Sequence, residues 1–170
     1  KEIAKKKPRL VVQPCQNRYL VLEPAIPIEP KMLDSVYMLP FTRKAHSKYR
    51  KPIPAFGFVR HSVVSHRGCY GGCSFCSLGA HQGKYIISRS EASIIKEIKT
   101  HICSQSDFKG TILDVGGPSA NMYASACLNR KECDRISCLY PNICPKLHYN
   151  QKKQISLLNK INSVDEIKNV

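Results

Sequence analysis

Three cysteines stand close together in one glycine-rich run of the sequence, CYGGCSFC, residues 69–76. Cysteine thiolates are the usual protein ligands of iron–sulfur clusters, and glycines let backbone N–H groups approach the cluster sulfurs. Because Cys69, Cys73 and Cys76 supply only three ligands, a cluster of four irons would keep one iron free of protein. The spacing therefore favours a 4Fe-4S cluster whose open iron can bind a substrate or cofactor.

Three other interpretations of these cysteines fit the sequence less well than the cluster. A zinc site normally combines CxxC pairs with a nearby fourth ligand, which here would have to be His66 or His81. A disulfide between two of the cysteines would leave an odd thiol. Three buried structural cysteines are not expected on one glycine-rich loop. A histidine that hydrogen-bonds within its own loop is the simpler interpretation of both His66 and His81. We therefore place the iron–sulfur interpretation first.

A second group of cysteines lies further along the chain, separated by five, four and five residues: Cys127, Cys133, Cys138 and Cys144. Four thiolates are enough to hold zinc or an auxiliary iron–sulfur cluster. The spacing matches neither the common zinc knuckles nor the tight ferredoxin run, and two disulfides would also account for it. We interpret the group as a possible second metal site of open identity.

The elements around the first cysteine run predict parallel β/α units. Residues 58–65 and 110–115 are rich in β-branched side chains and bounded by glycines, which is typical of strands. Between them Ser88 and Glu91 have the spacing of a capping box, with Ser90 as the rival N-cap. The helix that follows carries an apolar stripe of four isoleucines: Ile94, Ile95, Ile98 and Ile102.

A second helix is predicted over residues 151–161, with Ile155, Leu158 and Ile161 on one side, and another strand should follow it. Connections of this length exclude hairpins, so the strands should be parallel. Two β/α units alone leave a sheet edge exposed. The predicted fold class is therefore α/β, the first two βα units of an incomplete parallel β/α barrel.

The first part of the sequence is different in character. Residues 1–54 are basic and rich in proline, which excludes long helices and interior strands. We predict an N-terminal extension or inter-domain connector, with possible strands at 10–12 and 19–22 and a short helix near 31–38. Residues 55–170 should then be the truncated N-terminal part of the barrel domain. The first residue is Lys1, which suggests a chain cut from a longer one.

The composition and charge of the chain indicate which kinds of partner to expect. The 170 residues carry a formal net charge of +15, and residues 1–60 hold thirteen Lys and Arg against four Asp and Glu. A basic segment such as 5–9 attracts phosphate or acidic surfaces, although aromatic residues do not alternate with the basic ones as in a single-strand binding platform. No apolar run reaches the eighteen residues of a membrane-spanning helix, so we expect no membrane partner.

Several strings resemble one family closely. The spacing CxxxCxxC with an aromatic residue just before the last cysteine, here Phe75, resembles the signature of radical S-adenosylmethionine enzymes. A longer set of strings resembles the bacterial YgiQ family within them. These strings are SHRGC (65–69), HQG (81–83), SRSE (88–91), DVGGPSAN (114–121) and the lead-in YMLPFTR (37–43). The similarity spans roughly residues 37–147.

The resemblance implies a 4Fe-4S cluster held by Cys69, Cys73 and Cys76, with S-adenosylmethionine chelated to the open iron. The reduced cluster would cleave S-adenosylmethionine to a 5′-deoxyadenosyl radical, which abstracts hydrogen from a substrate that the sequence does not identify. Phe75 would pack near the adenine. Gly116 and Gly117 match the family's Gly-Gly-Glu motif for the methionyl amine, but Pro118 stands where the acid is expected.

The resemblance also implies partners and a location. An enzyme of this kind needs an electron donor such as flavodoxin or ferredoxin, and we expect it in the cytoplasm. The remaining cofactor contacts come from later strands in the superfamily, so this fragment should depend on the remainder of the full-length chain and be inactive alone. The alternative function is a structural zinc or iron–sulfur module with a basic nucleic-acid-binding surface.

Overall fold

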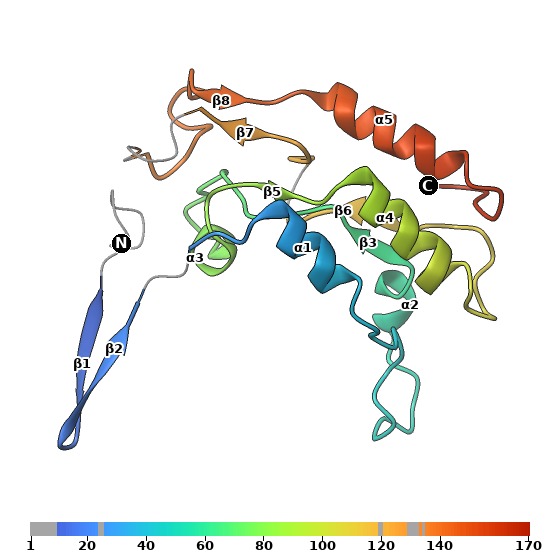
Figure 1. Cartoon of the computed structure of the whole chain (residues 1–170), viewed down its shortest axis with the longest axis horizontal. Coiled ribbons are helices and arrows are strands. Elements are labelled where there is room, and N and C mark those ends of the chain that lie inside the picture. Colours follow the sequence, from blue (N-terminus) through green and yellow to red (C-terminus); the bar gives the residue numbers. More distant parts are fainter. Residues whose placement is uncertain (1–9, 24–25, 119–120, 129–132, 134) are drawn as a thin grey trace.

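The computed structural model describes residues 10–23, 26–118, 121–128, 133 and 135–170. The predicted basic segment 5–9 lies outside them. A small parallel pair of strands forms the centre, where β3 (Ser62–Val64) lies beside β6 (Asp114–Gly116) with Val63 opposite Val115. The chain crosses between these strands through α4 (Glu91–Glu97), so β3, α4 and β6 form one β/α/β unit (Figure 1). The parallel arrangement of these two strands confirms the predicted strand direction, whereas the incomplete β/α barrel stays a prediction.

The helix α4 begins at the rival N-cap, because the Ser90 side chain accepts a hydrogen bond from the Ser93 N–H. It continues into a π-helical turn, η1 (Ile98–Ile102), in which the Cys103 N–H donates to the Ile98 carbonyl. Buried isoleucines four residues apart, at 94, 98 and 102, stay on one face because a π-turn is wider than an α-turn. The predicted stripe therefore faces the core.

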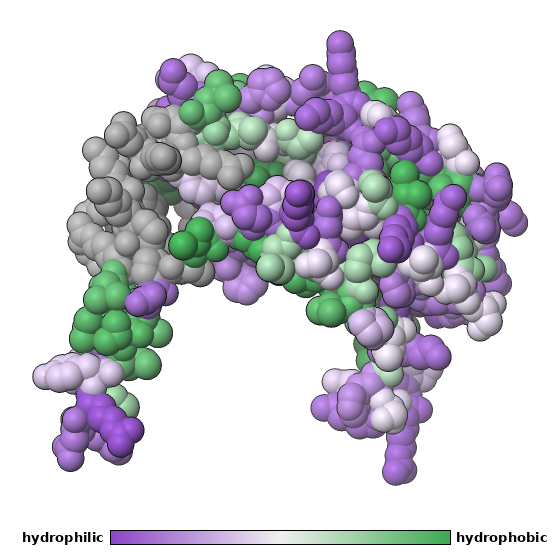
Figure 2. Space-filling model, viewed as in Figure 1, coloured by the Kyte–Doolittle hydropathy of each residue, from purple (hydrophilic) through white to green (hydrophobic). Residues whose placement is uncertain are grey.

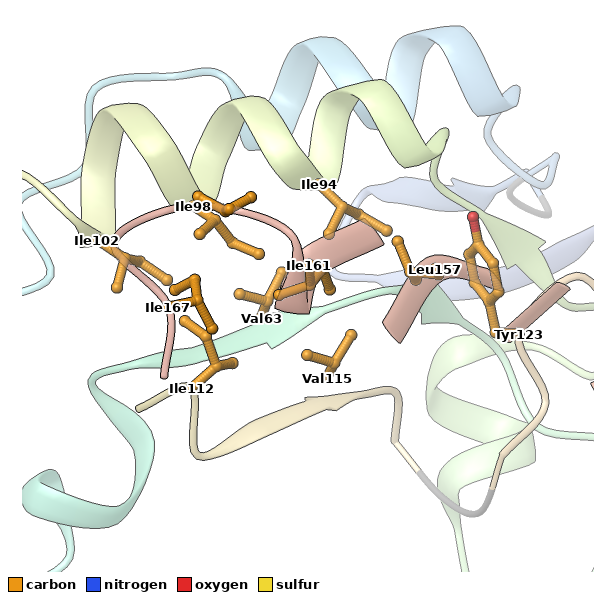
Figure 3. Close-up of a cluster of buried hydrophobic side chains, with 11 residues drawn as sticks. Val63, Ile94, Ile98, Ile102, Ile112, Val115, Tyr123, Leu157, Ile161 and Ile167 are labelled. Carbon is orange, nitrogen blue, oxygen red and sulfur yellow. The ribbon is translucent and has the colours of Figure 1, made fainter. Parts of the chain in front are cut away.

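The main hydrophobic core lies between α4, the strand pair and α5 (Gln151–Asn162), as Figure 3 shows. Asn150 caps α5 by accepting a hydrogen bond from the Lys152 N–H. The predicted helix is confirmed, but the predicted face is partly wrong: Leu157 and Ile161 are buried, while Ile155 is exposed. Leu157 and Ile161 lie four residues apart, and that pair rather than Ile155 meets α4.

The chain after α5 returns to the strand pair. Thr111 and Asn169 form a parallel bridge, and the Ile112 N–H donates to the Asn169 carbonyl at 3.0 Å. The predicted strand after the second helix is therefore present only as a single bridge, which lies on the side of segment 111–116 away from β3.

One predicted strand is wrong over half its length. Residues 58–65 were expected to be continuous strand, but Phe56–Val59 forms a helical turn, α2, closed by the Arg60 N–H on the Phe56 carbonyl. Pro54 lies in a turn just before α2, in which the Phe56 N–H donates to the Ile53 carbonyl at 3.0 Å, and the chain then enters β3 at Ser62. The exposed Phe58 and Val59 side chains gain no cross-strand neighbours there.

The N-terminal region has two different parts. The strands β1 (Val11–Cys15) and β2 (Arg18–Leu22) form an antiparallel hairpin that stands away from the body, with every residue exposed (Figures 1 and 2). By contrast, α1 (Pro30–Tyr37) contacts β5 (Ile87–Ser88) and α4. The predicted short helix and both predicted strands are confirmed. No helix among the described residues is long and apolar enough to cross a membrane.

Two further strand pairs hold the cysteine segments. β4 (His66–Arg67) pairs antiparallel with β5 and leads directly into the first cysteine run. β7 (Ala126–Cys127) pairs antiparallel with β8 (Leu147–His148) and encloses the second group. The short helix α3 (Leu78–Gln82) closes the first cysteine loop.

Candidate functional site

The first cysteine loop is tied at its base. The Cys69 N–H donates to the Gly83 carbonyl at 3.0 Å, so residues 69–83 form one closed loop. Gly68 has φ +91°, and a Cβ atom there would lie 2.0 Å from the Tyr85 carbonyl oxygen. Only glycine fits where the chain enters the loop, because any side chain would collide with backbone.

Inside the loop, backbone N–H groups point at sulfur. The Gly71 N–H donates to the Cys69 Sγ at 3.4 Å, and the Leu78 N–H donates to the Cys76 Sγ at 3.5 Å. A Cβ atom at Gly71 would lie 3.4 Å from the Cys69 Sγ and 3.6 Å from the Cys73 Sγ, so both sulfurs adjoin this glycine. Such N–H groups are the donors that tune a bound cluster.

The structure does not bring Cys69, Cys73 and Cys76 close enough together to act as one set of metal ligands. Cys69 is buried, whereas Cys73 and Cys76 are exposed. Across the described residues, no three His, Cys, Asp or Glu side chains are grouped closely enough to hold a metal ion. Phe75, predicted to pack near an adenine, is 91% exposed. The ligand roles of the three cysteines and the role of Phe75 stay predictions.

The predicted cofactor glycines lie beside a buried histidine. The Gly116 carbonyl accepts hydrogen bonds from both the N–H (2.6 Å) and the hydroxyl (3.0 Å) of Ser65. A Cβ atom at Gly117 would lie 2.3 Å from the His66 Nε2, so the imidazole packs directly on this glycine. Gly117 thus leaves room for the ring, a reason for glycine that does not require a cofactor.

The hydrogen bonds around Ser65 fix which nitrogen of His66 carries the proton. Because the Ser65 hydroxyl donates to Gly116, it accepts from the His66 Nδ1–H, 3.0 Å away. Nε2 therefore carries a lone pair. It is buried and has no hydrogen-bond partner within the described part of the chain. Such an atom is an acceptor available to a bound group.

The burial of His66 predicts an acid-sensitive fold. Desolvation lowers the pKa of His66 from 6.5 to about 4, and desolvation also lowers the pKa of His61. Between these pH values the unfolded chain binds protons that the native histidines do not, so the free energy of unfolding falls as pH drops from 6.5 toward 4. We expect His66 alone to account for up to about 3 kcal/mol. Urea unfolding against pH and an NMR titration of the imidazole measure this, and titration near 6.5 would contradict it.

The second cysteine segment packs against the first loop. The Ser137 hydroxyl donates to the Gly71 carbonyl at 2.5 Å, and the Cys138 N–H donates to the Tyr70 carbonyl at 3.0 Å. Gly72, with φ +62°, allows this approach, since a Cβ atom there would lie 2.6 Å from the Ile136 carbonyl oxygen. Cys69, Cys138 and Cys144 belong to one buried cluster. The two cysteine groups, separate in sequence, thus form one region.

Sequence reasoning missed two sets of contacts, one beside the second cysteine group and one further away. Lys84 donates to the Cys133 Sγ at 2.9 Å and also to the Arg135 carbonyl. Further away, the buried Glu97 carboxylate accepts hydrogen bonds from both Arg43 and Arg89. Nothing in the spacing of these residues indicates the contacts, although the strings around Arg43 and Arg89 are among those that carry the family resemblance.

The structure also places the second histidine near the cysteine run and three residues outside the loop. His81 lies on α3 within the closed loop 69–83, and Asp114 is exposed on β6. Cys15 is on the exposed hairpin, and Cys103 packs against the main core. A cavity of about 430 Å³ is lined by residues of β5, α5 and segment 123–125, and by none of the cysteines.

Comparison with known proteins supports the family resemblance. The family described as Radical SAM N-terminal matches residues 1–62. A UPF0313 protein of Methanocella arvoryzae is 46% identical over 150 residues, which cover 86% of this chain and 25% of that protein. UPF0313 proteins of Porphyromonas gingivalis (43% over 166 residues; 93% and 26%) and Methanocaldococcus jannaschii (46% over 158; 92% and 26%) are also similar. No solved structure gave a match.

These similarities define the class of protein as the radical S-adenosylmethionine superfamily. Within it, this chain belongs to the YgiQ-like family, whose members carry the name UPF0313. The chain spans about a quarter of the length of the curated relatives it matches.

Proposed function

We propose that this segment carries the cofactor-binding loop of a radical S-adenosylmethionine enzyme, with Cys69, Cys73 and Cys76 as ligands of a 4Fe-4S cluster. The observation that carries the proposal is that backbone N–H groups of this loop point at the sulfurs of Cys69 and Cys76. Three thiolates on one loop suit a cluster with one open iron. When bound, the cluster supplies an electron to S-adenosylmethionine, releasing methionine and a 5′-deoxyadenosyl radical that abstracts hydrogen from a substrate.

The residues of this chain would bind and orient the cofactor. Pro118 cannot provide the carboxylate that the family motif offers to the methionyl amine. His66 Nε2 is a buried acceptor packed on Gly117, and we assign to it the contact with that amine. The Gly117 backbone completes this side of the site. Phe75, exposed on the cysteine loop, would cover the adenine once the cofactor is bound.

The complete protein also needs a source of electrons. A chain of net charge +15 suits an acidic one-electron carrier, such as flavodoxin or ferredoxin, because complementary charge steers encounter. We place the protein in the cytoplasm, where thiols stay reduced and available as ligands. Further cofactor contacts would come from the remainder of the full-length chain.

Anaerobic reconstitution of the complete protein with iron and sulfide tests the proposal. We expect optical absorption and an electron paramagnetic resonance signal of a reduced 4Fe-4S cluster, and a change in that signal when S-adenosylmethionine is added. Replacing Cys69, Cys73 or Cys76 with alanine should abolish the signal, because each loss removes one of three ligands. Replacing Cys127 with alanine should leave it in place.

A histidine variant separates cofactor binding from cluster binding. His66→Ala should keep the cluster signal, which also shows that the loop still folds, but weaken its response to S-adenosylmethionine by about tenfold or more. An unchanged response would show that His66 does not contact the amine. A protein that takes up only zinc, with no cluster signal that responds to S-adenosylmethionine, would refute the enzyme and favour a structural metal-binding module.

A further inference from the structure

The hairpin formed by β1 and β2 carries apolar side chains on both of its faces. Opposite residues of an antiparallel pair share a face, and successive pairs alternate between the two faces. The register therefore places Val11 and Leu22 on one face and Val12 and Val21 on the other. These four side chains are 48–52% exposed. A hairpin of two strands is marginally stable at best in water, so both faces are suited to burial against another part of a protein.

The apolar side chains lie at the end of the hairpin that joins the rest of the chain. The turn at the far end consists of two polar residues, Gln16 and Asn17, and Gln16 has φ +53°. Figure 2 shows the same division, with hydrophobic surface near the body and hydrophilic surface at the tip. A partner that covers the hairpin should therefore contact its apolar half and leave the tip in solvent.

The two outer edges of the hairpin differ in what they can pair with. Residues along an antiparallel pair alternate between those whose N–H groups point at the partner strand and those whose N–H groups point away. Pro14 has no N–H, so the pair of Pro14 and Tyr19 is of the second kind. Two residues further along each strand, Val12 and Val21 are of the same kind. The outer edge of β2 thus presents the N–H and C=O groups of Tyr19 and Val21, whereas Pro14 interrupts the outer edge of β1.

The outer edge of β2 has no strand beside it in the described part of the chain, where β1 and β2 form a sheet of two strands. Free strand edges are templates for pairing, and proteins usually block them with proline or charged side chains. From Tyr19 to Leu22, β2 has neither. With apolar side chains on both faces, β2 has the properties of an interior strand and not of a sheet margin.

The curated relatives are much longer than this chain, which leaves length for a unit that covers the hairpin. The chain matches 25% and 26% of the length of two UPF0313 proteins. The family match over residues 1–62 includes the hairpin, so the hairpin belongs to the part that the family shares. Seven residues connect Leu22 to Pro30 of α1, and a chain of that length spans at most about 30 Å. A unit that covers the hairpin would therefore lie close to α1.

We propose that the outer edge of β2 pairs with a β-strand of the full-length chain outside residues 1–170, so that β1 becomes the edge strand of the sheet of that part. The same part buries both apolar faces of the hairpin, and Pro14 closes the completed sheet against further pairing. The helix α1, which contacts β5 and α4, then holds this part beside the candidate site. The pairing does not depend on whether the first cysteine loop binds a cluster.

Hydrogen exchange in the complete protein, followed by mass spectrometry with fragmentation to single amides, tests this pairing. The Tyr19 and Val21 N–H groups point away from β1, so pairing within the hairpin does not protect them. We expect the Val21 amide to exchange at least about tenfold more slowly than the Val12 amide, which points away from β2 at the edge that Pro14 interrupts. Equal exchange at Val12 and Val21, whether fast or slow, would overturn the proposal.

Proline variants of the complete protein form a matched pair, because Val12 and Val21 lie opposite each other and are 51% and 50% exposed. Val21→Pro removes an N–H from the proposed pairing edge and should accelerate exchange at the Tyr19 amide at least about tenfold. Val12→Pro removes the corresponding N–H from the interrupted edge and should leave exchange at Tyr19 within about threefold of wild type. Equal acceleration in the two variants would contradict the pairing. Protection of Tyr19 that falls on dilution, together with a fall in the mass measured by light scattering, would identify β2 of a second copy as the partner and overturn the proposal.

Discussion

Replacing Glu97 with glutamine should lower the free energy of unfolding by about 3–5 kcal/mol, the usual result of breaking a buried ion pair from one side. The Glu97 side chain is 1% exposed, and its two carboxylate oxygens accept hydrogen bonds from Arg43 and Arg89 respectively. In Glu97→Gln one of these oxygens becomes an NH₂ group, whose hydrogens would face a guanidinium that can only donate. Two buried arginine charges would then remain without a compensating carboxylate.

The contacts of the two arginines make the loss difficult to repair. Arg89 also donates to the Val64 carbonyl at 2.9 Å and lies over the Tyr37 ring, 4.2 Å from its centroid. Arg43 donates to the Ser62 carbonyl at 3.0 Å. Neither guanidinium can move to solvent without abandoning the backbone of β3. The unpaired arginine charges therefore stay buried in Glu97→Gln, and a buried unpaired charge lowers the free energy of unfolding strongly.

Glu91 in the same helix is the matched control. It pairs with Lys160, but the two side chains are 30% and 55% exposed, so solvent screens the pair. Glu91→Gln should change the free energy of unfolding by no more than about 1 kcal/mol. Urea unfolding of both variants in parallel gives the comparison. Equal unfolding midpoints for the two variants would mean that the Glu97 network, the ion pairs of Glu97 with Arg43 and Arg89, does not stabilise the fold.

The Glu97 network also supports the strand that leads into the candidate site. It fastens the lead-in segment that contains Arg43 to β3, and β3 continues into Ser65 and His66 beside Gly116 and Gly117. Asp34 of α1 adds a second contact by accepting from the Ser90 N–H at 3.0 Å. Part of the region predicted as an extension thus supports the strand from which the candidate site begins.

Local patterns predicted the helices of this chain better than its strands. The helix α5 was predicted because apolar residues recur along it, a short-range signal, and the structure adds the Asn150 cap. Residues 58–65 have the same β-branched character as a strand, yet four of them lie in or next to the turn α2. A strand exists only where a partner strand pairs with it, and Asp114–Gly116 pairs with Ser62–Val64 alone.

The sequence indicates the candidate ligands, whose roles stay predictions, but it does not indicate the contacts that support their loop. The spacing of Cys69, Cys73 and Cys76 is itself the signal, because all three lie on one loop. Lys84 and Cys133 are 49 residues apart, and Ser137 and Gly71 are 66 apart. Contacts of that separation depend on how β7 and β8 return the chain to the loop, which residue types and local periodicity do not specify.

Gly72→Ala should detach the second cysteine segment from the first cysteine loop. Gly72 has φ +62°, and an added Cβ would lie 2.6 Å from the Ile136 carbonyl oxygen and 3.0 Å from the Ser137 Cα. Both are backbone atoms, so segment 135–144 must move. Backbone strain and the collision together should lower the free energy of unfolding by about 2–4 kcal/mol. Hydrogen exchange at the Cys138 amide, which bonds to the Tyr70 carbonyl, should accelerate by at least about tenfold.

Gly83→Ala separates the collision from the backbone strain. Gly83 also has a positive φ, +85°, but a Cβ atom there would meet nothing within 4 Å. Gly83→Ala should therefore cost stability through strain alone and leave exchange at the Cys138 amide protected relative to Gly72→Ala. Equal exchange at the Cys138 amide in the two variants would mean that the two cysteine segments are held in place independently.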